Sequence, residues 1–169
     1  AKLAAYHLES PYKNNRNVLN CFCMDYKTYR PSPSLALFVK CFWSLEAPVN
    51  KVPEKQRIVP DGCMEMIFND GDLYHQILEN GQRLLQPRCF VFGQITSPLD
   101  IAPSGATGIF AIRFFPNGFA PFTTLALNSL DNRAVPLSEL YGEAGVELEK
   151  NVLAESTTTA RIAIIESFL

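Results

Sequence analysis

The sequence predicts a mainly β fold with C-terminal helices: an antiparallel jelly-roll barrel followed by a two-helix appendage. Apolar residues alternate with a period of about two from Tyr26 to Phe115, which is typical of half-buried strands. About eight such runs follow one another at close spacing, separated by turn residues, as in antiparallel barrels. After Phe115 the apolar period becomes that of a helix, so the helices are expected to follow the barrel.

The strand region contains two strong turn signals. Asp61-Gly62 and Asn80-Gly81 tolerate positive φ angles, so each predicts a tight reversal between strands. The apolar and aromatic stretch 35–45 predicts a short helix leading into a strand. The further strands are expected at 56–60, 63–69, 74–78, 83–86, 88–93, 99–102 and 107–115.

The helical part follows the stop signal Pro116-Asn117-Gly118, with a short helical turn expected at 119–125. Helical spacing from Leu137 predicts a first helix, and a cap region at 156–159 predicts the start of a second. The apolar positions that define the two helices are Leu140, Leu148, Val152, Ile162 and Ile165. These positions are expected to form a dimer seam or a coupling surface, and packing against the chain's own barrel is the alternative.

Length and composition limit the class of protein. The 169 residues suit one folded domain, and no apolar run approaches the roughly 20 residues of a membrane span. The first residues lack the apolar core of a secretion signal, so a cytoplasmic location is expected. The five cysteines are an odd, scattered set without a CxxC pair, which favours free thiols. Cys21 and Cys23 form a C-x-C, but without a nearby His or a second pair this is a weak signal for a metal or redox site.

We divide the chain into three parts. Residues 1–23 have no clear period and are interpreted as an N-terminal extension, either derived from an expression vector or an ordered arm. Residues 24–128 are expected to form the barrel, and residues 129–169 a helical dimerisation or linker segment. Because the sequence stops inside its second predicted helix, a further domain is expected to follow.

Three segments resemble the N-terminal sensor domain of AraC-type bacterial transcription regulators. They are 57–69 (RIVPDGCMEMIFN), 93–98 (GQITSP) and 108–118 (GIFAIRFFPNG). The resemblance implies a cupin-like barrel, a non-catalytic effector-sensing role, a small-molecule effector and a homodimer. It also implies that DNA is read by a C-terminal helix-turn-helix part, which this sequence lacks. The thinly spread Lys and Arg residues and a net charge of −2 predict no tight DNA binding by this part.

The candidate site lies among polar residues inside apolar strands. Alternation places Cys63, Glu65 and Ile67 on one face of their strand. In the strand 107–115 it places Arg113 on one face with apolar residues, where an unpaired charge is costly. These charges indicate either a structural Glu65–Arg113 ion pair or a pocket in which an arginine meets an anionic or hydroxylated ligand beside an aromatic wall. The candidate ligand-binding residues are Trp43, Arg57, Cys63, Glu65, Gln94, Arg113 and Phe115.

No catalytic residue, metal or cofactor is expected. The two histidines, His7 and His75, lie far apart in the sequence, unlike the histidine cluster that a cupin metal needs. Cys63 and His75 are the one tempting nucleophile–base pair, but a buried, inert cysteine is the commoner arrangement. A stand-alone cupin-like enzyme and a ligand-free dimerisation module are the alternative functions.

Overall fold

The computed structural model describes residues 24–49 and 55–169, which form ten strands and three α-helices. The mainly β prediction with C-terminal helices is confirmed, whereas the cupin-like jelly-roll arrangement stays a prediction. The predicted extension at 1–23, with His7, Cys21 and Cys23, lies outside the described residues. Among the described residues, no helix has the length and apolar character needed to cross a membrane.

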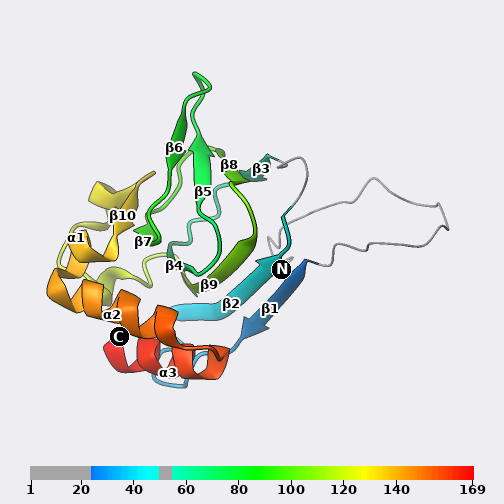
Figure 1. Ribbon diagram of the computed structural model, residues 1–169. Helices are drawn as coiled ribbons and strands as arrows, with labels where there is room; N and C mark the ends of the chain where they lie inside the picture. Colours follow the sequence, from blue (N-terminus) through cyan, green and yellow to red (C-terminus); the bar gives the residue numbers. More distant parts are fainter. Residues whose placement is uncertain (1–23, 50–54) are drawn as a thin grey trace, which may run out of the picture.

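The larger sheet has six antiparallel strands in the order β1-β2-β9-β4-β7-β10 (Figure 1). Its strands are β1 (Asp25–Tyr29), β2 (Val39–Ala47), β4 (Glu65–Asn69), β7 (Cys89–Phe92), β9 (Thr107–Phe114) and β10 (Ala134–Pro136). Strand β9 lies between β2 and β4, and the register places Glu65 directly opposite Arg113. The two charges that the sequence singles out are therefore cross-strand neighbours.

The smaller sheet has four antiparallel strands in the order β3-β8-β5-β6. Its strands are β3 (Gln56–Ile58), β5 (Tyr74–Ile77), β6 (Arg83–Leu85) and β8 (Leu99–Pro103). The hairpin between β5 and β6 turns at Asn80-Gly81, where the Leu78 N–H donates to the Gln82 carbonyl at 2.9 Å. The strongest turn signal in the sequence is thus confirmed.

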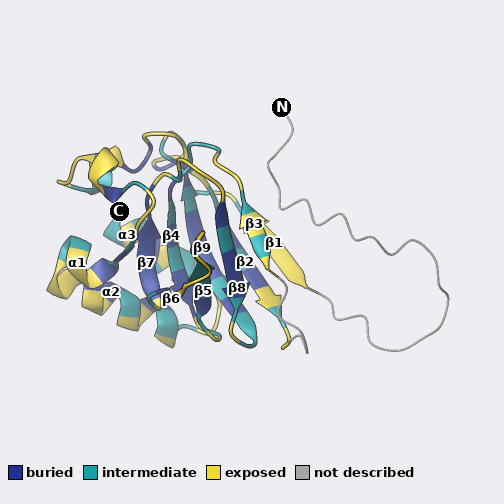
Figure 2. Cartoon of the chain, turned by 90° about the horizontal axis from the view of Figure 1, so that it is seen from above, coloured by how far each residue is buried: buried dark blue, intermediate teal, exposed yellow. Residues whose placement is uncertain are grey.

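The six-stranded sheet is the middle layer, with the smaller sheet on one face and the helices on the other (Figure 1). Alternation along its strands produces two cores. Met66, Phe68 and Ile112 face the helices, whereas Phe90 and Phe92 belong to the core shared with the smaller sheet. Buried residues are concentrated along this middle sheet, as Figure 2 shows.

The C-terminal part contains α1 (Leu137–Tyr141), α2 (Glu143–Ala154) and α3 (Thr158–Phe168). The first predicted helix is divided at Gly142, whose φ of 58° and ψ of −133° lie outside the helical region. Helix α3 begins where the cap region predicts, because the Thr157 side chain accepts a hydrogen bond from the Ala160 N–H. The start of the second predicted helix is therefore confirmed as the start of α3, whereas the break at Gly142 was not predicted.

Two further segments differ from expectation. The short helix expected at the start of 35–45 is a turn, in which the Val39 N–H donates to the Leu35 carbonyl at 2.8 Å before β2 begins. Strand β10 is absent from the prediction because three residues carry no detectable alternation. The short helical turn expected at 119–125 is present as η1 (Ala120–Phe122), and η2 (Leu127–Leu130) follows it.

The helices pack on this chain's own sheet. Leu148, Val152 and Ile165 are buried among side chains of the six-stranded sheet, and Leu140 and Ile162 are partly buried against or beside the same core. The prediction of a surface seam is wrong for the three buried residues, since their side chains are enclosed within the chain. Packing against the chain's own β structure, the alternative, accounts for them.

Replacing Ile165 by Ala is expected to lower the free energy of unfolding by about 2–5 kcal/mol, the usual cost of truncating a fully buried aliphatic side chain. Ile165 is 0% exposed, whereas Val146 on α2 is 56% exposed. The matched control Val146→Ala should change stability by less than about 0.5 kcal/mol. Urea denaturation of both variants measures the difference, and equal stabilities would contradict the packing of α3 on the sheet.

Candidate ligand pocket between the two sheets

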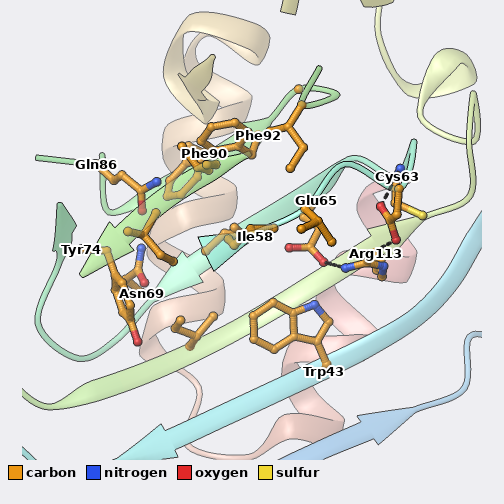
Figure 3. A pocket seen from close by; sticks show the side chains of 18 residues that line it. Trp43, Ile58, Cys63, Glu65, Asn69, Tyr74, Gln86, Phe90, Phe92 and Arg113 are labelled. Carbon is orange, nitrogen blue, oxygen red and sulfur yellow. Dashed lines mark hydrogen bonds and ion pairs between the residues drawn. The ribbon is translucent and has the colours of Figure 1, made fainter. Parts of the chain in front are cut away.

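A cavity of about 70 Å³ lies between the smaller sheet and the pocket-facing side of the larger sheet (Figure 3). Most of its wall is apolar or aromatic, with Trp43 on one side and Phe90 and Phe92 on another. The remaining apolar lining residues are Ile58, Val59, Ile67, Ile95, Leu99, Ile101 and Ile109. Polar side chains gather at the two ends of this apolar space, and each end has a distinct chemistry.

Arg113 defines the charged end. Its guanidinium forms ion pairs with both Asp61 and Glu65, and the three side chains are 15–22% exposed. Asp61 also accepts a hydrogen bond from the Cys63 N–H at 3.1 Å, which closes the turn that leads into β4. Asp61 therefore serves both the turn geometry and the ion pair.

The surroundings shift the pKa values of these groups in opposite directions. Burial raises the pKa of Glu65 above 4.5, and the Arg113 guanidinium offsets this effect only in part. Burial also disfavours ionised Asp61, but the Cys63 N–H and Arg113 outweigh it and lower the pKa of Asp61 below 3.8. The carboxylates of Glu65 and Asp61 outweigh the burial of Arg113 and raise its pKa, so the guanidinium stays charged.

Asn69 marks the opposite end, beside Tyr74 and Gln86 (Figure 3). Its side chain is buried, and Nδ2 donates to the carbonyl oxygen of Arg88 at 3.2 Å. Because a carbonyl accepts only from a donor, this bond fixes which end of the amide is the oxygen. Among the described residues, Asn69 Oδ1 is the buried side-chain atom that has no hydrogen-bond partner.

Four of the seven predicted ligand-binding residues line this cavity: Trp43, Cys63, Glu65 and Arg113. The other three do not, so their assignment to the pocket is corrected. Arg57 points away from it because Ile58, its neighbour on β3, takes the inward position, and Arg57 instead pairs with Asp100 at 2.7 Å. Gln94 is exposed, and Phe115 is 39% exposed beyond the end of β9.

Several lining residues are absent from the predicted site. Asp61 is predicted only as a turn residue within the resemblance segment 57–69, and Asn69, the last residue of that segment, only as the end of an apolar strand. The sequence could have indicated Phe90 and Phe92 as lining residues. They alternate with Cys89 and Val91, which places both aromatic side chains on one face of β7. Tyr74 and Gln86 enter the site through the placement of the smaller sheet, which local sequence does not show.

Cys63 and His75 do not form a nucleophile–base pair in this pocket. Tyr74 points into the pocket, so its neighbour His75 lies on the opposite face of β5, and His75 is absent from the pocket wall. Burial raises the pKa of the Cys63 thiol, which disfavours the reactive thiolate. Within residues 24–49 and 55–169, no three metal-ligating side chains of His, Cys, Asp or Glu come together.

The three segments that carry the sensor-domain resemblance converge beside Gly62. A Cβ placed on Gly62 would lie 3.5 Å from Pro116 Cγ and 3.7 Å from Gln94 Nε2. Gly93, next to Gln94, has no room for a side chain, because a Cβ there would overlap the Leu130 carbonyl oxygen. The segments are distant in sequence but together build the charged end of the pocket and the wall behind it.

A family model described as "Domain of unknown function (DUF6597)" matches residues 27–136. No curated protein matches the chain. A solved structure similar to part of it is described as "Crystal Structure of HTH_3 family Transcriptional Regulator from Vibrio cholerae". It aligns at 14% identity with a TM-score of 0.40, over 55% of this chain and 51% of that chain, so the match spans about half the length of the regulator. These values are too low to transfer its fold or its role.

Replacing Arg113 by Met is expected to destabilise the domain by about 3–5 kcal/mol, because Asp61 and Glu65 would lose the cation that compensates their burial. The matched control is Arg57→Met, which removes an exposed arginine from its pair with Asp100. This control should leave stability almost unchanged, since solvent screens an exposed pair. Equal losses in urea denaturation would refute the assignment of Arg113 as the central charge.

Glu65 is expected to titrate above pH 4.5 and Asp61 below pH 3.8 in the folded protein. As the pH falls through the folded pKa of Asp61, its stabilising contribution is lost. Glu65 acts in the opposite direction: its raised pKa favours the folded state at low pH, and this benefit is lost as the pH rises through its folded pKa. Carboxyl-carbon NMR titration checks both midpoints, and reversal of their order would contradict the described contacts.

Proposed function

The chain belongs to the DUF6597 family, and we propose that it is the effector-sensing and dimerisation domain of a cytoplasmic AraC-type transcription regulator. In this proposal the two sheets correspond to a cupin-like jelly-roll barrel, and the domain binds a small molecule without catalysing a reaction. The single observation that carries the proposal is the pocket between the two sheets, whose apolar wall bears a few placed polar groups at its ends. Small-molecule sites generally have this composition.

The position of the resemblance segments supports the same function. Asp61 comes from the first segment, Gln94 from the second, and Arg113 with Pro116 from the third. All of them lie at or directly behind one end of the pocket. Residues shared with a sensor domain are thus concentrated at the candidate binding site and not dispersed over the surface.

A direct route leads from the pocket wall to the helices. Asn69 lines the pocket, and the next residue, Asp70, accepts a hydrogen bond from Arg161 Nη1 at 2.6 Å. Arg161 lies on α3 and also donates to the Glu155 carbonyl oxygen at 2.9 Å. A ligand that binds one conformation of Asn69 better than another would therefore favour one position of α3, because the neighbouring Asp70 contacts Arg161 on that helix.

The proposed assembly is a homodimer, with DNA contacted only by a separate helix-turn-helix domain. Because Leu148, Val152 and Ile165 are buried in the chain's own core, the dimer contacts would be made by other residues. A ligand-free dimerisation module is the second candidate function. It is favoured by the small cavity and by the ion pairs that already occupy Arg113.

Native mass spectrometry of the purified domain tests the proposal. We expect a dimer carrying a small organic mass that is released on denaturation. The pocket-filling variant Ile109→Phe should lose this mass, whereas the control Leu84→Phe, at a position 51% exposed on β6, should retain it. An empty dimer for the unmodified domain favours the ligand-free module, and a stoichiometric metal favours a cupin-like enzyme.

A further inference from the structure

We propose that the pocket selects a short, uncharged, mainly apolar molecule whose hydroxyl or N–H group donates a hydrogen bond to Asn69 Oδ1. This inference rests on the proposed sensor function and names the chemical class of its ligand. Three properties of the pocket carry it: the unpartnered acceptor at one end, the neutralised arginine at the other, and the volume between them.

The acceptor is Asn69 Oδ1. The Asn69 side chain is buried on the pocket face of β4, and its amide nitrogen is held by the backbone carbonyl of Arg88. A buried carbonyl oxygen without a donor costs about 1–3 kcal/mol, so a ligand that supplies one gains this free energy on binding. The nearby Tyr74 hydroxyl is engaged with the Thr107 hydroxyl at 2.7 Å. The acceptor therefore selects for a donor on the ligand.

The charged end disfavours an anion. Both Asp61 and Glu65 pair with Arg113, and a second cation, Lys40, lies beside this end with its Nζ 4.0 Å from Cys63 Sγ. The protein's own two carboxylates already balance these two cations, so a carboxylate ligand would gain no unpaired cation and would lose its hydration. Of the two ligand classes expected from the sequence, anionic and hydroxylated, this arrangement favours the hydroxylated one.

The cavity limits the size of the ligand. Its volume of about 70 Å³ is well below the roughly 150 Å³ of a protein cavity that binds benzene. The ligand should therefore be smaller than benzene, with at most about five non-hydrogen atoms. The apolar wall between the two ends then contacts the hydrocarbon part of such a molecule, while its donor reaches Asn69.

NMR titration of the whole chain with three probes of similar length tests the inference. The probes are 1-butanol, which has a hydroxyl donor, 1-fluorobutane, which has none, and butyrate, which is an anion. We expect 1-butanol to shift the resonances of pocket residues and to bind at least about fivefold more tightly than either other probe, as one satisfied buried acceptor implies. Asn69→Leu should remove the preference for 1-butanol over 1-fluorobutane, whereas Asn128→Leu, at an exposed position outside the pocket, should preserve it.

Each other result overturns a defined part of the proposal. Equal binding of 1-butanol and 1-fluorobutane would mean that Asn69 Oδ1 serves only a bound water molecule. Tighter binding of butyrate would overturn the ligand class but leave the sensor function standing. If none of the probes shifts pocket resonances at millimolar concentration, the ligand class is overturned, whereas the sensor function is decided separately by the mass that the purified domain carries in native mass spectrometry. The ranking is measured on the unmodified chain, so it decides the outcome even if Asn69→Leu does not fold.

Discussion

The antiparallel pairing of β4 with β9 determines which side chains face the pocket and which face the helices. Glu65 lies opposite Arg113, and Met66 lies opposite Ile112. A slip of one residue would turn the buried charges toward the helices and the apolar residues toward the pocket. The ion pairs of Arg113 with Glu65 and Asp61 favour the observed register, because any other register would leave buried charges uncompensated.

The same register joins the proposed binding site to the helical layer. Along β4, inward residues line the pocket while Met66 and Phe68 support the core beneath α2 and α3. At the end of this strand, Asn69 faces the pocket and Asp70 contacts Arg161 of α3. Two successive residues thus connect the pocket wall with the helical layer.

The pocket changes the chemical interpretation of the candidate site. From its place in an apolar strand, Arg113 is expected to need a negatively charged partner. Either a carboxylate of the protein or an anionic ligand could be that partner. In the folded chain two carboxylates satisfy it, and the buried side-chain atom that lacks a partner within the described residues is the amide oxygen of Asn69. The group available to a ligand is therefore an acceptor at the other end of the cavity, and not the cation.

Local sequence patterns predict most of the strands, the Asn80-Gly81 hairpin, the cap of α3 and the inward faces of β4 and β9, because alternation, turn residues and capping act over a few neighbouring residues. It also indicated the Glu65–Arg113 pair. Three features depend on the tertiary fold: Asp61 completes this pair, Arg57 points away from the pocket, and Asn69 lines the pocket beside Tyr74. These contacts depend on how one sheet is placed on the other, and residues distant in the chain set that placement through packing that no local pattern encodes.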